Sequence, residues 1–171
     1  MPTLIVEDGT NVTNANSYID LTYLASYASD RNYSLPTLDV DKEIFVIRGM
    51  DYLEGQLFNG SRTNDDQALN WPRQNVFIDC ELFDEESIPE LLKKALAQLV
   101  IEQQLRTPLY PQPRTSAVEG FVTEKTVGPL TKKFTPIGGM VSSLVPIKIA
   151  SVEVFLRQLR CCAGSLETVR I

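Results

Sequence analysis

The side chains that most often do chemistry in proteins are scarce in this sequence. None of its 171 residues is histidine, which removes histidine-based catalytic triads, histidine metal ligands and the usual proton shuttle. Its three cysteines, Cys80, Cys161 and Cys162, show no spacing typical of a metal site, and we interpret them as ordinary thiols. We therefore expect a protein that is not an enzyme and that uses no metal and no cofactor.

Five carboxylates precede the most strongly signalled helix of the chain and could hold a hard cation. They are Asp79, Glu81, Asp84, Glu85 and Glu86. A calcium loop needs a more regular alternation of oxygen ligands and a sharp glycine turn, and this stretch has neither. We interpret the cluster as acidic residues placed ahead of the positive end of a helix dipole.

Residues 119–135 allow two functional interpretations. Residues 121–126 alternate between the two faces of a strand, Gly128-Pro129 marks a turn and residues 130–134 give a return strand, which together predict a β-hairpin. Its lysines and phenylalanines could form a small stacking and phosphate-binding surface for single-stranded nucleic acid. Alternatively, the hairpin is an arm that pairs with a strand of a neighbouring subunit through backbone hydrogen bonds.

The charge balance favours the second interpretation. The formal net charge is -6 at pH 7, and the isoelectric point is about 4.7. A protein whose main task is to grip phosphates normally has a basic surface, so this balance argues against nucleic-acid binding as the main function. The few aromatic residues near the lysines point the same way, and we favour the arm.

The sequence gives no sign of a membrane or export segment. No apolar run approaches the roughly 20 residues that cross a bilayer. The opening MPTLIVEDGTN lacks the basic start and long apolar middle of a signal peptide. We expect the protein to be made and kept in a reducing cytoplasm, without membrane contact.

Apolar residues recur at helical spacing in four stretches. These cover about residues 17–29, 39–57, 88–105 and 146–159. They predict a mainly α fold, a small helical bundle of about four helices with a protruding β-hairpin arm and extended termini. We expect one domain over residues 1–171, with a helical core at about 15–105 and 146–160, the hairpin arm at about 118–135 and a C-terminal tail at 161–171.

Local signals refine these helices. Ser87 and Glu90 predict a capping box at the start of the core helix. Gly49, inside the second helix, costs about 1 kcal/mol against alanine, and a close helix–helix contact would explain it. The side chains expected to cap the first two helices are those of Asn14 or Asn16 and of Asp39.

Three segments in a fixed order resemble a known family. They are LIVEDGTNVTNANSYIDL, IRGMDYLEG, and NWPRQNV followed by IPELLKKALAQLV, with EKTVGPLTKKF behind them. In that order they resemble the head–tail connector (adaptor) proteins of tailed bacteriophages, whose members are often catalogued as DnaT-like single-stranded-DNA-binding proteins. The resemblance covers about residues 3–135.

The resemblance implies a structural protein of the virion neck, made in the host cytoplasm. It implies a homo-oligomeric ring of about twelve copies between the portal protein and a stopper or tail-completion protein. The genome would pass through the ring as double-stranded DNA without specific binding, and an acidic wall would avoid trapping it.

Two surfaces follow as hypotheses from this resemblance. The hairpin would contact a neighbouring subunit or a downstream component through Phe121, Val122, Lys125, Leu130, Lys132, Lys133 and Phe134. The last helix and tail would contact the portal through Phe155, Arg157, Arg160, Leu166, Val169, Arg170 and Ile171. The alternative function is a replication accessory protein that binds single-stranded DNA, for which only the hairpin offers lysines beside aromatic rings.

Overall fold

The computed structural model of the protein describes residues 3–110, 122–124, 133–134 and 148–160. By its contacts the chain divides into two compact units, residues 1–109 with 148–171 and residues 110–147. The single domain expected over residues 1–171 stays a prediction.

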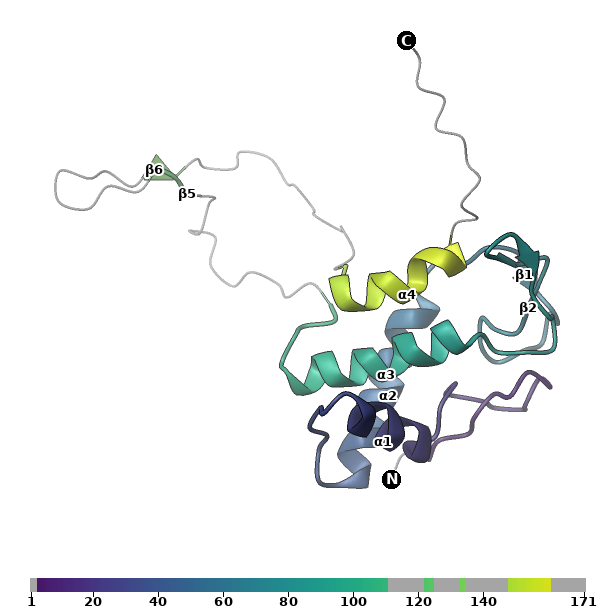
Figure 1. Ribbon diagram of the computed structural model, residues 1–171, viewed down its shortest axis with the longest axis horizontal. Helices are drawn as coiled ribbons and strands as arrows, with labels where there is room; N and C mark the ends of the chain where they lie inside the picture. The colour runs from purple at the N-terminus through teal and green to yellow at the C-terminus, as the bar shows by residue number, and fades with distance from the viewer. Residues whose placement is uncertain (1–2, 111–121, 125–132, 135–147, 161–171) are drawn as a thin grey trace, which may run out of the picture. The chain divides into compact units, whose positions relative to one another are not determined.

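The first unit is built from four helices in the described residues. These are α1 (Leu21–Asp30), α2 (Asp39–Glu54), α3 (Glu90–Gln104) and α4 (Ala150–Arg160). The helix-rich fold with four helices is confirmed. Helix α3 contacts each of the other three, and Figure 1 shows it between α4 and α1.

Helix α3 is buried around most of its circumference, as expected for the central helix of a fold. Its buried residues are Leu92, Ala95, Leu96, Ala97, Gln98, Leu99, Val100 and Ile101. Gln98, which the spacing predicts on the polar side, is instead buried and accepts a hydrogen bond from the Tyr27 hydroxyl at 3.0 Å. A methyl group on Gly49 of α2 would lie 2.9 Å from Leu96 Cδ1. The close helix–helix contact inferred for Gly49 is therefore confirmed.

The start of α1 differs from the prediction. Helix α1 begins at Leu21, because the Asp20 carboxylate caps it by accepting the Tyr23 backbone N–H at 2.6 Å. The Asn16 side chain is used elsewhere: its Oδ1 accepts the Ile5 N–H at 2.8 Å. This contact ties down the first residues, where Val6 forms an isolated parallel bridge with Ser17. The helix therefore starts four residues later than predicted.

The predicted caps of α2 and α3 are also wrong. Asp39 is the first residue of α2 rather than its cap, and it pairs with Lys42 at 2.7 Å. Ser87 does not form the capping box, because its hydroxyl donates to Asp84 Oδ2 at 2.5 Å. Helix α3 begins after Pro89, and the Glu90 carboxylate accepts the Tyr23 hydroxyl at 2.6 Å.

Two short antiparallel ladders lie between α2 and α3 in the chain, in a region where the sequence suggests only loops. Strand β1 (Ser61–Arg62) pairs with β2 (Arg73–Gln74). Strand β3 (Phe77–Ile78) pairs with β4 (Glu81–Leu82). Each strand has two residues, too few for alternation to be visible in the sequence.

The second unit contains the predicted hairpin. Strand β5 (Val122–Glu124) pairs antiparallel with β6 (Lys133–Phe134), with Val122 opposite Phe134 and Glu124 opposite Lys133. The ladder is irregular between Val122 and Glu124. The rest of the predicted arm, and the predicted tail, lie outside the described residues.

A buried polar network joins three distant segments of the first unit. The Tyr18 hydroxyl donates to Glu54 Oε1 at 2.7 Å and accepts the Trp71 backbone N–H at 3.1 Å. The other carboxylate oxygen of Glu54 accepts the Asn70 N–H at 2.8 Å. Tyr18 and Trp71 are almost completely buried. The network therefore fixes the segment before α1 and the segment before β2 to the end of α2.

We expect Tyr18→Phe to destabilise the fold by about 1–3 kcal/mol, because it leaves the buried Trp71 N–H without its acceptor and Glu54 Oε1 without its donor. Urea unfolding followed by tryptophan fluorescence measures the change. Tyr33→Phe is the matched control, since Tyr33 is 40% exposed. Equal stability of the two variants would contradict the role assigned to the network.

Glu54 also makes stability depend on pH. Burial raises the pKa of its carboxyl above the ordinary value of 4.5, although hydrogen bonds from Tyr18 and Asn70 oppose the shift. The folded state therefore holds this proton more tightly than the unfolded chain does. The contribution of Glu54 to the free energy of unfolding then falls as pH rises from 4.5 through the raised folded pKa.

We expect wild-type protein to lose stability relative to Glu54→Gln as pH rises through this window. Urea titrations at several pH values between about 4 and 7 measure the difference. Glu81→Gln, at an exposed carboxylate, controls for the loss of one negative charge. A difference between wild type and Glu54→Gln that stays constant with pH would contradict the assignment.

Candidate functional site

Positive and negative charges are divided unequally along the chain. Residues 1–109 contain eight lysines and arginines against 18 aspartates and glutamates, a net charge of -10. Residues 110–171 contain eight lysines and arginines against four glutamates, a net charge of +4. The excess of negative charge therefore lies in residues 1–109, which we call the acidic part. The hairpin and the last helix lie in residues 110–171, which we call the basic part.

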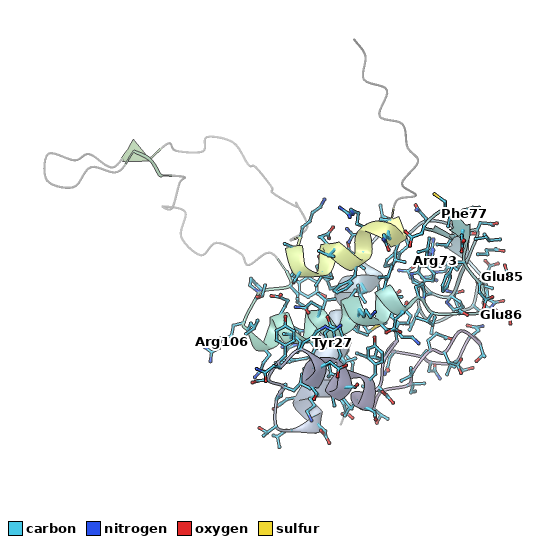
Figure 2. All side chains as sticks on the ribbon, in the orientation of Figure 1. Tyr27, Arg73, Phe77, Glu85, Glu86 and Arg106 are labelled. Atoms are coloured by element: carbon cyan, nitrogen blue, oxygen red, sulfur yellow. The ribbon has the colours of Figure 1, made fainter. Side chains whose placement is uncertain are left out.

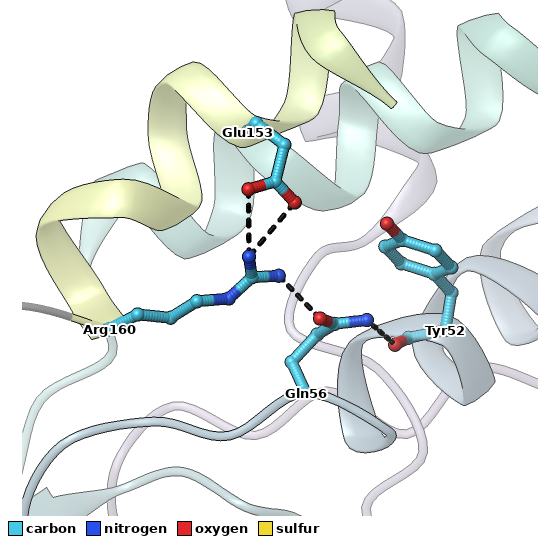
Figure 3. A network of polar contacts seen from close by, with 4 residues as sticks. All are labelled: Tyr52, Gln56, Glu153 and Arg160. Carbon is cyan, nitrogen blue, oxygen red and sulfur yellow. Dashed lines mark hydrogen bonds and ion pairs between the residues drawn. The ribbon is translucent and has the colours of Figure 1, made fainter. Parts of the chain in front are cut away.

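Helix α4 carries two arginines with different roles. The Arg160 guanidinium contacts both carboxylate oxygens of Glu153, at 2.9 and 2.8 Å, and donates to Gln56 Oε1 (Figure 3). Gln56 in turn donates to the Tyr52 carbonyl at 2.9 Å. Arg160 thus fastens α4 to the end of α2, and its guanidinium is engaged by Glu153 and Gln56.

Arg157 lies on the outer face of the same helix. Its side chain and that of Lys148 are exposed, and neither has a hydrogen bond or an ion pair within the described residues. Both line a depression of about 450 Å³ together with Val154, which is 66% exposed. Glu153, already paired with Arg160, and Ala150 complete the lining. This face, which we call the α4 basic face (Lys148, Val154, Arg157), offers two available cations beside an apolar side chain.

Several cations of the acidic part are engaged within the fold. Arg73 donates to four backbone carbonyls, and the shortest of these bonds, to Gly60, is 2.7 Å. Burial lowers the pKa of its guanidinium. Arg31 lies over the Tyr27 ring at 3.8 Å from its centroid. These side chains position loops and helix ends.

The residues predicted for the two interfaces are only partly described. Val122, Lys133 and Phe134 lie on the β5–β6 ladder. On α4, Phe155 is half-buried, Arg157 is exposed and Arg160 is held by Glu153. The other predicted residues, Phe121, Lys125, Leu130, Lys132, Leu166, Val169, Arg170 and Ile171, lie outside the described residues.

Neither a metal site nor a membrane span is present in the residues that the structure describes. They contain no group of three or more cysteine, aspartate or glutamate side chains arranged to hold a metal ion. None of the helices within them is long and apolar enough to cross a membrane.

Comparison with known proteins places this helix-rich protein with a basic C-terminal part in a family. The model of the family described as "Putative DnaT-like ssDNA binding protein" matches residues 2–171. The chain therefore belongs to the Putative DnaT-like ssDNA binding protein family. No curated protein and no solved structure matches the chain.

This finding corrects the phage-connector interpretation. The family match covers the whole chain under a description of single-stranded-DNA binding, and nothing in it points to a head–tail connector. The predicted ring, portal and stopper partners, passage of double-stranded DNA and virion-neck location are therefore wrong. The family supports the alternative function weighed from the sequence. The error arose because the function was inferred from the resemblance of three ordered segments to connector proteins. The description of such proteins as DnaT-like single-stranded-DNA-binding proteins was given less weight.

The net charge of the whole chain is a poor guide to phosphate binding, for a physical reason. Phosphates respond to the local potential within about 10 Å of a surface, not to the net charge of the whole chain. Separate counts for the two parts would have identified the basic part from sequence alone. No sequence signal separated Arg157 from Arg160, because both suit the C-terminal end of a helix.

We expect Arg160→Met to destabilise the fold by about 1–3 kcal/mol, because Glu153 and Gln56 then lose their shared donor. Arg157→Met, on the outer face of the same helix, should change stability by less than about 0.5 kcal/mol. Urea unfolding of both variants measures the contrast. A similar decrease in the free energy of unfolding for both variants would contradict the different roles assigned to the two arginines.

Proposed function

We propose that this chain binds single-stranded DNA through its basic part, residues 110–171. The single observation that carries the proposal is the charge division, because a net charge of +4 in this part attracts phosphates while the remainder is strongly acidic. The family description supports the same ligand.

Two surfaces supply the contacts in this proposal. The hairpin contributes Lys125, Lys132 and Lys133, with Phe121 and Phe134 as rings on which unpaired bases stack. The α4 basic face adds two exposed cations beside Val154. Stacking requires bases that are free of a partner strand, which favours single strands over duplex. Phosphate contacts and stacking together bind without reading sequence.

The finer features of the predicted fold belong to this proposal as well. The hairpin, about residues 118–135, acts as an arm that leaves a helical bundle, and the termini are extended. In this proposal the chain works as one domain and has no catalytic role, and the sequence contains no histidine to act as a general base.

We expect the triple variant Lys125→Ala, Lys132→Ala, Lys133→Ala to bind a fluorescein-labelled oligothymidylate about tenfold to a hundredfold more weakly in low salt. The slope of log affinity against log salt should become shallower by about 2, because each lost phosphate contact removes about 0.7. Fluorescence anisotropy over a salt series measures both quantities.

A variant with the same charge change provides the control. Arg48→Ala, Lys93→Ala, Lys94→Ala removes three cations from the acidic part and should leave the slope unchanged. Lys148→Ala, Arg157→Ala should weaken binding with a slope change of about 1. Equal losses in the control and hairpin variants, or no binding by wild type in low salt, would refute the proposal.

A further inference from the structure

The β3–β4 hairpin presents an apolar pair to solvent. Phe77 and Leu82 are directly opposite each other in its register, so their side chains share one face of the two-stranded ladder. Phe77 is 43% exposed and Leu82 is 65% exposed. The Phe83 N–H donates to the Val76 carbonyl at 2.8 Å and continues the pairing inward. A short hairpin thus holds two large apolar side chains at the surface.

A depression lies beside this pair. It has a volume of about 360 Å³ and is lined by Asn75, Leu82, Phe83, Asp84 and Glu85. The Phe83 ring packs edge-to-face on the buried Trp71, with ring centroids 6.1 Å apart. One wall of the depression is therefore fixed to the core.

Asp84 and Glu85 are exposed, and hydrogen bonds hold the Asp84 carboxylate in place. Asp84 accepts the Glu86 N–H at 3.2 Å and the Ser87 hydroxyl at 2.5 Å, and these hydrogen bonds lower the pKa of its carboxyl. The Glu85 carbonyl accepts the Thr63 hydroxyl at 3.1 Å, which ties the segment to the loop after β1. Figure 2 shows Phe77, Glu85 and Glu86 at one end of the first unit, with Arg106 at the other.

The charge around the pair is of one sign. Residues 75–86 contain five carboxylates and no lysine or arginine. Such a surface repels phosphates, so it does not extend the DNA-binding site. The described residues hold no group of three ligands that could bind a metal ion.

We propose that Phe77, Leu82, Asp84 and Glu85 form a docking surface for a basic segment of a partner protein. The segment carries an aliphatic side chain next to lysine or arginine. Its aliphatic group packs on the Phe77–Leu82 pair, and its cation pairs with Asp84 and Glu85 at the edge of the depression. Charge complementarity selects this occupant, because an acidic or phosphate-bearing partner meets only carboxylates here.

The surface differs in charge from the proposed DNA contacts, although β3 contacts α4. It belongs to the acidic part of the chain, whereas the proposed DNA contacts belong to the basic part. The apolar pair gives the contact a component that salt does not screen, which separates docking from general attraction of cations to an acidic protein.

The test uses the full chain and a short fluorescein-labelled peptide in which lysine alternates with leucine. We expect wild type to bind it and Leu82→Ala to bind it about tenfold more weakly in fluorescence anisotropy, from the lost burial of the leucine side chain. Leu38→Ala is the matched control, because Leu38 is 64% exposed and precedes another acidic stretch, Asp39 to Glu43. This control should bind as wild type does.

A second peptide separates the apolar from the ionic part of the contact. Replacing its leucines by serine should weaken binding to wild type about tenfold and remove the difference between wild type and Leu82→Ala. Asp84→Asn, Glu85→Gln should weaken binding of the leucine peptide and reduce its salt dependence. Equal binding by Leu82→Ala and Leu38→Ala would overturn the proposal. A change in the oligomeric state of Leu82→Ala without a change in peptide affinity would also overturn it.

Discussion

The buried carboxylate of Glu54 is the constraint on which the body of this protein depends. It sits at the end of α2, where the Tyr18 hydroxyl and the Asn70 backbone both donate to it. A desolvated charge is costly unless it is hydrogen-bonded, so the segments that supply these donors must stay in place. Trp71 follows Asn70, and its ring packs on Phe58 and Phe83. The loops between α2 and α3 are thereby anchored to the core at Asn70 and Trp71.

This anchoring explains how two short ladders are stable on the surface. Isolated two-stranded hairpins are marginal in water, and β1–β2 and β3–β4 have only two residues a strand. Arg73 gathers the carbonyls of residues 58–60 and 70, while Phe83 reaches the Trp71 ring. The same contacts hold the exposed Phe77–Leu82 pair. Helix α4 contacts β3, and Arg160 fastens this helix to Gln56 while Arg157 faces outward.

The sequence predicted features that repeat and missed those that depend on a distant partner. Periodicity located all four helices and explained Gly49, because a 15-residue helix such as α3 shows its apolar face several times over. The caps were wrong where a side chain had a competing partner in space, as Ser87 has in Asp84. The hairpin at residues 122–134 was found because its turn and alternation are local. Only part of the candidate site could be predicted from the sequence. The hairpin lysines were identified, but the net charge of the whole chain concealed the difference in charge between its two parts.

That division limits how densely the protein can cover a strand. In the proposed complex, the phosphates neutralise the basic part, and each bound copy then displays ten uncompensated negative charges from residues 1–109. Neighbouring copies repel one another at separations below the Debye length, about 10 Å at 0.1 M salt. If the proposed complex forms, this repulsion makes occupancy of a long strand anticooperative at low ionic strength. In that complex, bound copies would lie apart from one another, with stretches of bare strand between them.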